Sequence, residues 1–201
     1  MGDPLRTRET ILEAAERIIV HSGVEKATID EVAREARISK GGVLHHFPSK
    51  EAIAVALLER LIEIFESDVN ARQALDPDPV GSFTRAFLQV VNERTDNCSE
   101  VGYALKSGFR QSPALQKLAI AAHMRWQARV ESDGLDPVRT SVVRLATDGL
   151  WLARVNRVAV PSEGLRKPLI EFLLSLTRSV SEPTRAPSHP VRKRSAKTNA
   201  L

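Results

Sequence analysis

TIDEVAREARISKGGVLHHFPSK, residues 28–50, has the most specific local pattern in the chain. Thr28 and Glu31 have the T-x-x-E spacing of a capping box, in which each side chain binds a free backbone N–H group at a helix start. The apolar side chains from Ile29 to Ala36 then recur on one face at helical spacing. The pattern therefore predicts a helix that begins at Thr28.

A second, shorter helix is expected after a tight turn. Arg37 and Ile38 form the turn, and Ser39 can cap a helix of about two turns that ends before Pro48. Two short helices joined in this way form a helix-turn-helix, whose second helix lies in the major groove of DNA. The glycines at positions 41 and 42 each disfavour a helix by roughly 1 kcal/mol, so they need another explanation. Bare backbone beside Lys40 can approach a phosphate closely, whereas the plain alternative is a loop glycine pair.

The residues of this stretch resemble the signature of the tetracycline-repressor (TetR) family of bacterial transcription regulators. The resemblance covers the run SKGGVLHHFPSK from Ser39 to Lys50 and the run TIDEVA from Thr28 to Ala33. Leu44 departs from the pattern, because many members carry a tyrosine there that contacts the DNA backbone. Since leucine cannot donate that hydrogen bond, Leu44 either lacks the contact or touches a thymine methyl group. The rest of the chain resembles the family only in length and helical pattern.

Helix geometry and the resemblance together predict a DNA-binding surface. Thr28, the Lys40–Gly41 pair and Lys50 are expected to contact the DNA backbone, whereas other residues of the second helix face base edges. The adjacent histidines could instead form a metal pair, but no cysteine or carboxylate nearby completes a tetrahedral set, so no metal or cofactor is expected. The predicted DNA-binding residues are Thr28, Lys40, Gly41, Gly42, Leu44, His45, His46 and Lys50; among them, Gly42 and His45 are expected at base edges, and the resemblance implies a phosphate contact for His46.

Charge and composition describe an ordinary soluble globular chain. The 201 residues are 42% hydrophobic, which is enough for a packed core. Five basic and no acidic residues follow Glu182, so the tail accounts for the net charge of +4. Within the first 50 residues eight basic residues balance eight acidic ones, so DNA affinity has to come from where the charges lie. The tail is expected to be disordered, either as a solubilising segment or as a nonspecific DNA clamp.

Cysteine content and hydropathy indicate the compartment. Cys98 is the single cysteine, which excludes an internal disulfide and fits a reducing environment. The N-terminus lacks the apolar region of a signal peptide, and no run of roughly 18 apolar residues occurs. The expected protein is therefore cytoplasmic and independent of membranes.

The remaining sequence has helical patterning and no strand pattern. A first helix, starting near Asp3-Pro4 or Thr7 and ending at Ser22-Gly23, braces the two motif helices. A long helix from about Lys50 to Ala74 joins the DNA-binding part to the rest of the chain, and the prolines of 76–79 end this helix in a rigid turn. Further helices are expected over about 83–91, 100–108 with a break at 96–99 before it, 113–133, 136–160 and 162–181. We therefore predict an all-α fold of about nine helices, with a three-helix helix-turn-helix head at 1–49, a helical-bundle ligand-binding and dimerisation body at 50–182, and a disordered basic tail at 183–201.

The last two long helices predict a homodimer. The helix at 136–160 is apolar on two sides, so one side can pack into the body and the other against a second copy. The resemblance implies the same pairing, and a monomer with a thicker core is the alternative. The predicted interface residues are Trp151, Val155, Leu169, Phe172, Leu173 and Leu176.

A mostly apolar effector pocket is expected in the body. Aromatic and polar side chains are the candidates, although plain cores use the same residue types. The candidate ligand-binding residues are Phe83, Phe87, Tyr103, Phe109, Met124, Trp126, Trp151 and Asn156.

These patterns and the resemblance predict one function and leave alternatives. The predicted protein binds double-stranded DNA at a palindromic operator as a homodimer, acting as a repressor that a small apolar or amphipathic ligand releases. The alternatives are a DNA-binding activator without a small-molecule effector and a helical protein-interaction module. No enzyme is expected, because the chain has no nucleotide-binding glycine loop, nucleophile elbow or HExxH motif.

Overall fold

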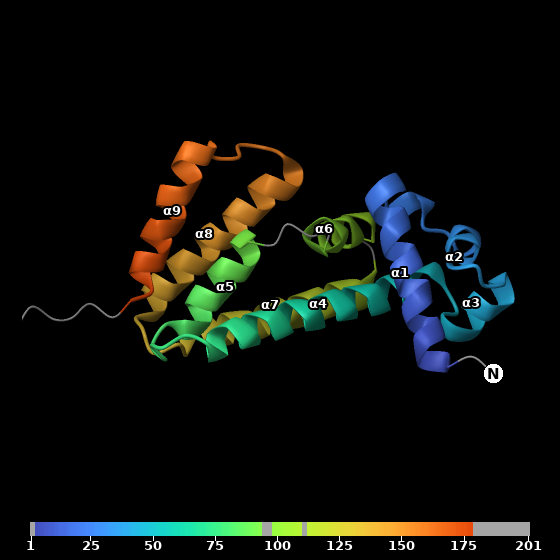
Figure 1. Ribbon diagram of the computed structural model, residues 1–201, viewed down its shortest axis with the longest axis horizontal. Helices are drawn as coiled ribbons and strands as arrows, with labels where there is room; N and C mark the ends of the chain where they lie inside the picture. The colour runs from blue at the N-terminus through green and yellow to red at the C-terminus, as the bar shows by residue number, and fades with distance from the viewer. Residues whose placement is uncertain (1–2, 94–97, 110–111, 179–201) are drawn as a thin grey trace, which may run out of the picture.

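The computed structural model describes residues 3–93, 98–109 and 112–178, and in these ranges the chain forms nine α-helices and no strand (Figure 1). This confirms the predicted all-α fold. The head consists of α1 (Pro4–Ser22), α2 (Ile29–Ala36) and α3 (Lys40–His46), with the short 3-10 helix η1 (Val24–Lys26) between the first two. The body consists of α4 (Lys50–Ala74), α5 (Ser82–Glu93), α6 (Cys98–Gly108), α7 (Pro113–Glu131), α8 (Pro137–Asn156) and α9 (Glu163–Leu176).

Polar caps begin the motif helices. Thr28 Oγ1 accepts the N–H group of Glu31 at 3.2 Å and so caps α2. Ser39 and Ser49 cap α3 and α4 in the same way, at 3.0 and 3.1 Å. The reciprocal half of the predicted capping box is absent, because the N–H group of Thr28 donates to the Lys26 carbonyl oxygen at 2.8 Å and the Glu31 carboxylate pairs with Arg34 on the next turn of the helix.

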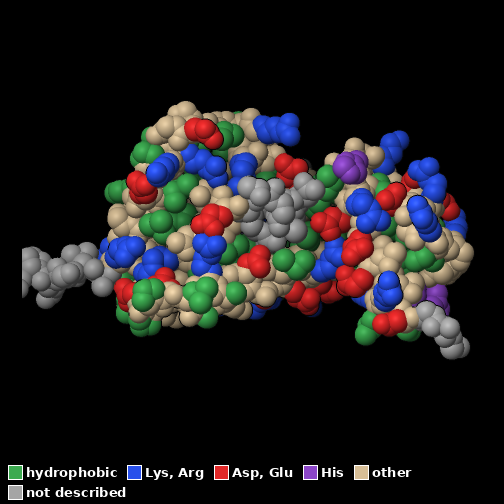
Figure 2. Space-filling model, in the orientation of Figure 1, with side chains coloured by type: hydrophobic (Ala, Val, Ile, Leu, Met, Phe, Trp, Pro, Cys, Tyr) green, Lys and Arg blue, Asp and Glu red, His purple; other side chains and the backbone are tan. Residues whose placement is uncertain are grey.

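A continuous core joins the head to the body. Val43 of α3, Leu57 of α4 and Leu105 of α6 belong to one buried cluster that also includes the inner face of α1. Figure 2 shows acidic side chains gathered near this junction. There the guanidinium of Arg60 on α4 is held between the carboxylates of Glu9 and Glu16 on α1. A head too small to be stable alone therefore shares its core with the body.

The body extends away from the head along α4. Helix α7 runs beside α4, while α5, α8 and α9 form the end of the molecule far from the head (Figure 1). Helix α6 lies across the middle and contacts both α1 and η1 of the head. Phe83, Phe87 and Val130 form a second core under α5, and Leu88, Val143 and Leu173 form a third between α5, α8 and α9.

The rigid turn predicted after α4 is held by a buried arginine. The guanidinium of Arg85 donates to both carboxylate oxygens of Asp76, at 2.7 and 3.0 Å, and also to the carbonyl oxygens of Val80 and Thr177. These hydrogen bonds lower the pKa of Asp76, although its burial opposes the effect. One side chain thus ties the end of α4 to α5 and to the end of α9.

The N-terminus of α5 is capped from a distant loop. Asp133, which follows α7, accepts the N–H groups of Phe83 at 3.0 Å and Thr84 at 2.7 Å. Gly81 precedes them with a φ of 76°, and a Cβ atom there would lie 2.3 Å from the carbonyl oxygen of Thr177. Only glycine fits this close approach.

Three predicted helix boundaries were wrong. Helix α8 ends at Asn156 and not near Val160, because Arg157 adopts the left-handed conformation with a φ of 54°. Helix α6 begins at Cys98, earlier than the predicted residue 100. The last helix, α9, ends at Leu176, before the predicted end at 181. The predicted tail at 183–201 lies outside the described residues, as does the part of the predicted break at 96–97. The domain boundaries at 49–50 and 182–183 stay predictions.

Candidate nucleic-acid interface and ligand cavity

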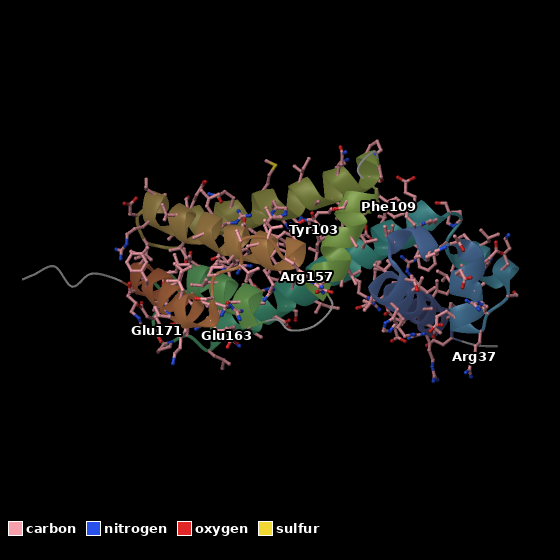
Figure 3. The ribbon with its side chains drawn as sticks, turned by 90° about the horizontal axis from the view of Figure 1, so that it is seen from above. Arg37, Tyr103, Phe109, Arg157, Glu163 and Glu171 are labelled. Atoms are coloured by element: carbon pink, nitrogen blue, oxygen red, sulfur yellow. The ribbon has the colours of Figure 1, made fainter. Side chains whose placement is uncertain are left out.

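The second motif helix, α3, has one face in solvent and the other in the core of the head. Gly41 and His45 lie on the solvent face one helical turn apart, beside Leu44, whose side chain is 40% exposed. Val43 points inward and is fully buried. Figure 3 places Arg37, the left-handed residue that ends α2, at the outer end of the head. The exposed face of α3 is thus free to meet another molecule.

The two glycines of α3 have different surroundings. A Cβ atom on Gly41 would have no neighbour within 4 Å. A Cβ atom on Gly42 would lie 2.7 Å from Ile38 Cγ2 and 3.2 Å from Ser39 Oγ. The packing of the turn therefore explains Gly42, and its predicted place at base edges stays a prediction. Gly41 has no such explanation within the protein.

The predicted phosphate contacts differ in how far they are already engaged. Lys40 Nζ forms an exposed ion pair with Asp30 Oδ1 at 3.0 Å, and such pairs stabilise little, so this ammonium can be exchanged to a phosphate. Thr28 uses its oxygen as an acceptor, which leaves its O–H group to donate. Lys50 Nζ is half-buried and donates to the carbonyl oxygen of Glu25 at 3.1 Å. Lys50 therefore also has a role inside the protein.

The two histidines of α3 lie at its C-terminal end. Their ring centroids are 5.3 Å apart in an edge-to-face arrangement, with His45 exposed and His46 half-buried. No group of three potential metal ligands occurs among the residues that the structure describes. The position of His45 on the exposed face fits a contact with a partner.

The body contains an apolar cavity of about 120 Å³ between α4, α5, α6, α7 and α8. Three of the predicted ligand-binding residues, Phe87, Trp126 and Trp151, line it. The other apolar lining residues are Leu58, Leu61, Ile62, Phe65, Val91, Ala119 and Ala122, with Gly102 contributing backbone. Trp126 Nε1 donates to Glu66 at 2.9 Å, which fixes the orientation of the indole.

The other five predicted ligand-binding residues do not line the cavity. Phe83 is buried in the core beneath the guanidinium of Arg129, 4.0 Å from its ring centroid. Met124 is 68% exposed on the outer side of α7. Figure 3 shows Tyr103 and Phe109 on α6, with Phe109 at the end nearer the head. The hydroxyl group of Tyr103 donates to Asn156 Oδ1, an exposed contact between α6 and α8.

Titratable side chains that the sequence analysis did not predict also line the cavity. They are Lys106 of α6, His123 of α7 and Asp148 of α8. Burial lowers the pKa of the Lys106 ammonium and raises the pKa of the Asp148 carboxyl group. Burial, with the nearby Lys106 and Arg144 charges, lowers the pKa of His123 to about 4, so this ring is neutral at pH 7. In the sequence, each of these three residues occupies a position that would suit an exposed polar side chain, and they come together only in the folded protein.

A stripe of exposed apolar residues runs along α8 and α9. Val138, Val142, Leu145 and Leu152 of α8 are 70%, 49%, 70% and 48% exposed, with the three- and four-residue spacing of a helix-packing seam. Leu165 and Phe172 extend the exposed apolar surface on α9.

These positions revise the predicted dimer residues. Phe172 is exposed as an interface requires, whereas Leu173 is buried against Leu88 and Val143 and has no surface left for a partner. Trp151 lines the cavity. Val155, Leu169 and Leu176 are half-buried, and their role in an interface stays a prediction.

Two family models match the chain, one in each half. The model described as bacterial regulatory proteins of the tetR family matches residues 11–57, which include α2 and α3. A model of the tetracyclin repressor-like C-terminal domain matches residues 81–178. The chain belongs to the TetR family. None of the helices in the described ranges is long and apolar enough to cross a membrane.

Relatives agree with this TetR-family assignment. The regulator TtgR of Pseudomonas putida is 36% identical over 88 residues, which cover 43% of this chain and 42% of TtgR, less than half of its length. The regulator BetI 2 of Chromohalobacter salexigens is 26% identical over 176 residues, 81% of this chain and 82% of that protein.

Solved structures match over most of the chain. The multidrug binding protein EbrR complexed with ethidium has a TM-score of 0.65 and 25% identity, covering 85% of this chain and 97% of EbrR. The same protein complexed with imidazole has a TM-score of 0.64 and 26% identity, covering 89% of this chain and 93% of EbrR.

Proposed function

We propose that this TetR-family chain is a homodimeric transcriptional repressor that binds a palindromic operator through α2 and α3 and is released by a small ligand held in the body cavity. In this proposal it acts in the bacterial cytoplasm by binding, without catalysis. The observation that carries the proposal is the exposed face of α3 in a family-typical helix-turn-helix, on a body whose apolar cavity is reached by α6. The regulators TtgR and BetI 2 support the DNA-binding part, and the EbrR complexes support a ligand in such a body.

Helix α6 offers a physical link between the cavity and the head. Gly102 and Lys106 line the cavity, and Gly108 at the C-terminal end of the same helix has no room for a Cβ atom, which would lie 2.4 Å from Val24 Cγ1 of η1. The ring of Phe109 lies 5.8 Å from Lys50 Nζ, which itself holds the Glu25 carbonyl of η1. A ligand that moves α6 would thus push on η1 and on the start of α4. Release from DNA then requires that the ligand bind more tightly to the shifted arrangement.

A second copy of the chain is the partner that best fits the exposed stripe of α8 and α9. Such a dimer would pair these helices into a four-helix interface and place two heads on one duplex. Two heads related by a two-fold axis read an inverted repeat, which is why the proposed operator is palindromic.

Selection of bound sequences from random duplex DNA tests the function. The wild type and a Lys40→Ala, His45→Ala double variant would be selected in parallel at moderate salt, and circular dichroism would establish that both are folded. We expect an enriched inverted repeat for the wild type and none for the variant, because both changed side chains lie on the exposed surface of the motif.

The opposite results have definite meanings. Absence of an enriched sequence for the folded wild type would refute the repressor proposal and favour a protein-interaction module. Equal enrichment by the double variant would show that DNA is bound by another surface.

A further inference from the structure

The charged groups around the body cavity differ in whether they have hydrogen-bond or ion-pair partners. Arg144 is buried and donates to Gln127 Oε1 at 2.8 Å and to the His123 carbonyl oxygen at 3.3 Å. Its Nε atom lies 3.6 Å from Asp148 Oδ2 and has no hydrogen-bond acceptor among the described residues. Lys106 is half-buried and its Nζ atom lies 4.9 Å from the ring centroid of Trp151. Within the part of the chain that the structure describes, this ammonium has no hydrogen-bond acceptor, and no carboxylate lies within ion-pairing distance.

The groups in the cavity lining and directly beside it carry an excess of positive charge. Lys106 and Asp148, the single carboxylate, lie in the lining, and the buried Arg144 lies outside the lining next to Asp148, which therefore faces two positive charges. His123 is neutral at pH 7 and adds no charge. Glu66, which binds Trp126 from outside the lining, is already paired with Arg125 at 2.9 Å. An entering cation would meet two positive charges against one negative charge, whereas an entering anion would complete the pairing.

The apolar lining limits what the anion can carry. The walls are leucine, isoleucine, phenylalanine, alanine and tryptophan side chains, which cannot solvate a second charge. The volume of about 120 Å³ is close to that of an engineered apolar cavity in another protein, about 150 Å³, that holds benzene. A ligand with one charge and one ring, or a short aliphatic chain, matches both the lining and the size.

We infer that the cavity binds a small monocarboxylate with an apolar body, whose carboxylate accepts hydrogen bonds from the Lys106 ammonium while its ring or chain packs between α4 and α7. The inference rests on the proposed function in taking this ligand as the effector, but binding can be measured without DNA. Binding a carboxylate would give Lys106 the acceptor that the described residues do not supply, on the face of α6 that lines the cavity. The neighbouring Trp151 ring keeps the ammonium in place before the ligand enters.

Tryptophan fluorescence of the full chain is the direct test. The chain has two tryptophans, Trp126 and Trp151, and both line the cavity, so a ligand there perturbs every tryptophan in the protein. The probes are benzoate, 3-phenylpropionate and octanoate, compared at pH 7 with benzylammonium and benzyl alcohol, which keep the ring but change the charge. Calorimetric titration gives the same affinities independently of fluorescence.

Two variants separate the charges of the cavity. Lys106→Met keeps the length of the side chain and removes the ammonium, and Asp148→Asn is the matched control that removes the opposite charge. We expect at least one carboxylate to bind the wild type more tightly than benzylammonium, and Lys106→Met to weaken that binding by about tenfold or more. Asp148→Asn should leave carboxylate binding unchanged or strengthen it.

The contrary outcomes are clear-cut. Tighter binding of benzylammonium that is lost in Asp148→Asn would overturn the inference in favour of a cation site. Absence of binding by all three carboxylates up to millimolar concentration, or unchanged affinity in Lys106→Met, would also overturn it. Operator selection distinguishes the two proposals: DNA binding without carboxylate binding refutes the ligand class alone, and carboxylate binding without DNA enrichment refutes the repressor function alone.

Discussion

Replacing each glycine of α3 by alanine shows whether that glycine is needed for DNA binding or for packing inside the protein. Alanine at position 41 would place its methyl group in open space, and helix propensity would then stabilise the head by up to about 1 kcal/mol. On the exposed face of α3, however, that methyl group would stand between the backbone and a bound phosphate or base. We expect Gly41→Ala to be at least as stable as the wild type and to bind operator DNA about tenfold more weakly, which corresponds to about 1.4 kcal/mol.

Gly42→Ala is the matched control with the opposite signature. Its methyl group would lie 2.7 Å from Ile38 Cγ2, about 1 Å closer than an ordinary carbon contact. Ile38 is branched at Cβ and cannot swing away, so the turn between α2 and α3 has to shift. Overpacking of this kind costs about 1–3 kcal/mol, which exceeds the propensity gain. We expect a net loss of roughly 1–2 kcal/mol in the free energy of unfolding.

Two assays on the same preparations decide the matter. Urea unfolding followed by circular dichroism gives stability, and fluorescence anisotropy with the selected operator at one fixed salt concentration gives affinity. Wild-type affinity in Gly41→Ala would refute the need for bare backbone at this position. Wild-type stability in Gly42→Ala would refute the packing explanation of the second glycine.

Three further changes test the body. Arg85→Met should lower the free energy of unfolding by about 3–5 kcal/mol, because it leaves the Asp76 carboxylate and three carbonyl groups without their donor. Urea unfolding measures this, with the exposed Arg125→Met as a control expected to cost less than about 1 kcal/mol. The pKa of His123 is lowered from 6.5 to about 4, so on acidification the unfolded chain takes up a proton before the folded chain does. The free energy of unfolding should therefore fall by about 2 kcal/mol as the pH decreases from 6.5 to about 4. A His123→Asn variant should lack this part of the pH dependence, and an identical slope in both proteins would contradict the buried neutral ring. Leu145→Glu should turn the dimer into a folded monomer in analytical ultracentrifugation, and an intact dimer would show that α8 does not form the interface.

The motif could be predicted from sequence because its signals are local. Thr28, Ser39 and Ser49 each bind an N–H group three residues ahead, so the capping side chain and its target lie within one short run. The failed half of the capping box is equally local: Glu31 had two partners within reach and formed an ion pair with Arg34 instead. A spacing rule names the possible partners but does not decide between them.

The cavity could be predicted only in part, because its charged residues have no common sequence signal. Lys106, His123 and Asp148 lie on three different helices, and each occupies a position that would suit an exposed polar residue. Three of the aromatic lining residues, Phe87, Trp126 and Trp151, were predicted because ligand pockets favour aromatic side chains. Periodicity showed that α8 is apolar on two sides, but it could not tell which side faces inward.

The structure of α8 indicates how ligand and partner can act on the same protein. Its Asp148 and Trp151 form a wall of the cavity, while Leu145 and Leu152 lie on the exposed stripe. In the proposed dimer a second copy covers that stripe, so α8 becomes the fixed wall of the cavity. A ligand that needs more than about 120 Å³ must then displace another wall, and α6, which carries Lys106, is one that also reaches the head. Since the C-terminal end of α6 has no free space against η1 at Gly108, the displacement is passed to the head. Dimerisation would thereby give the ligand a rigid surface to push against.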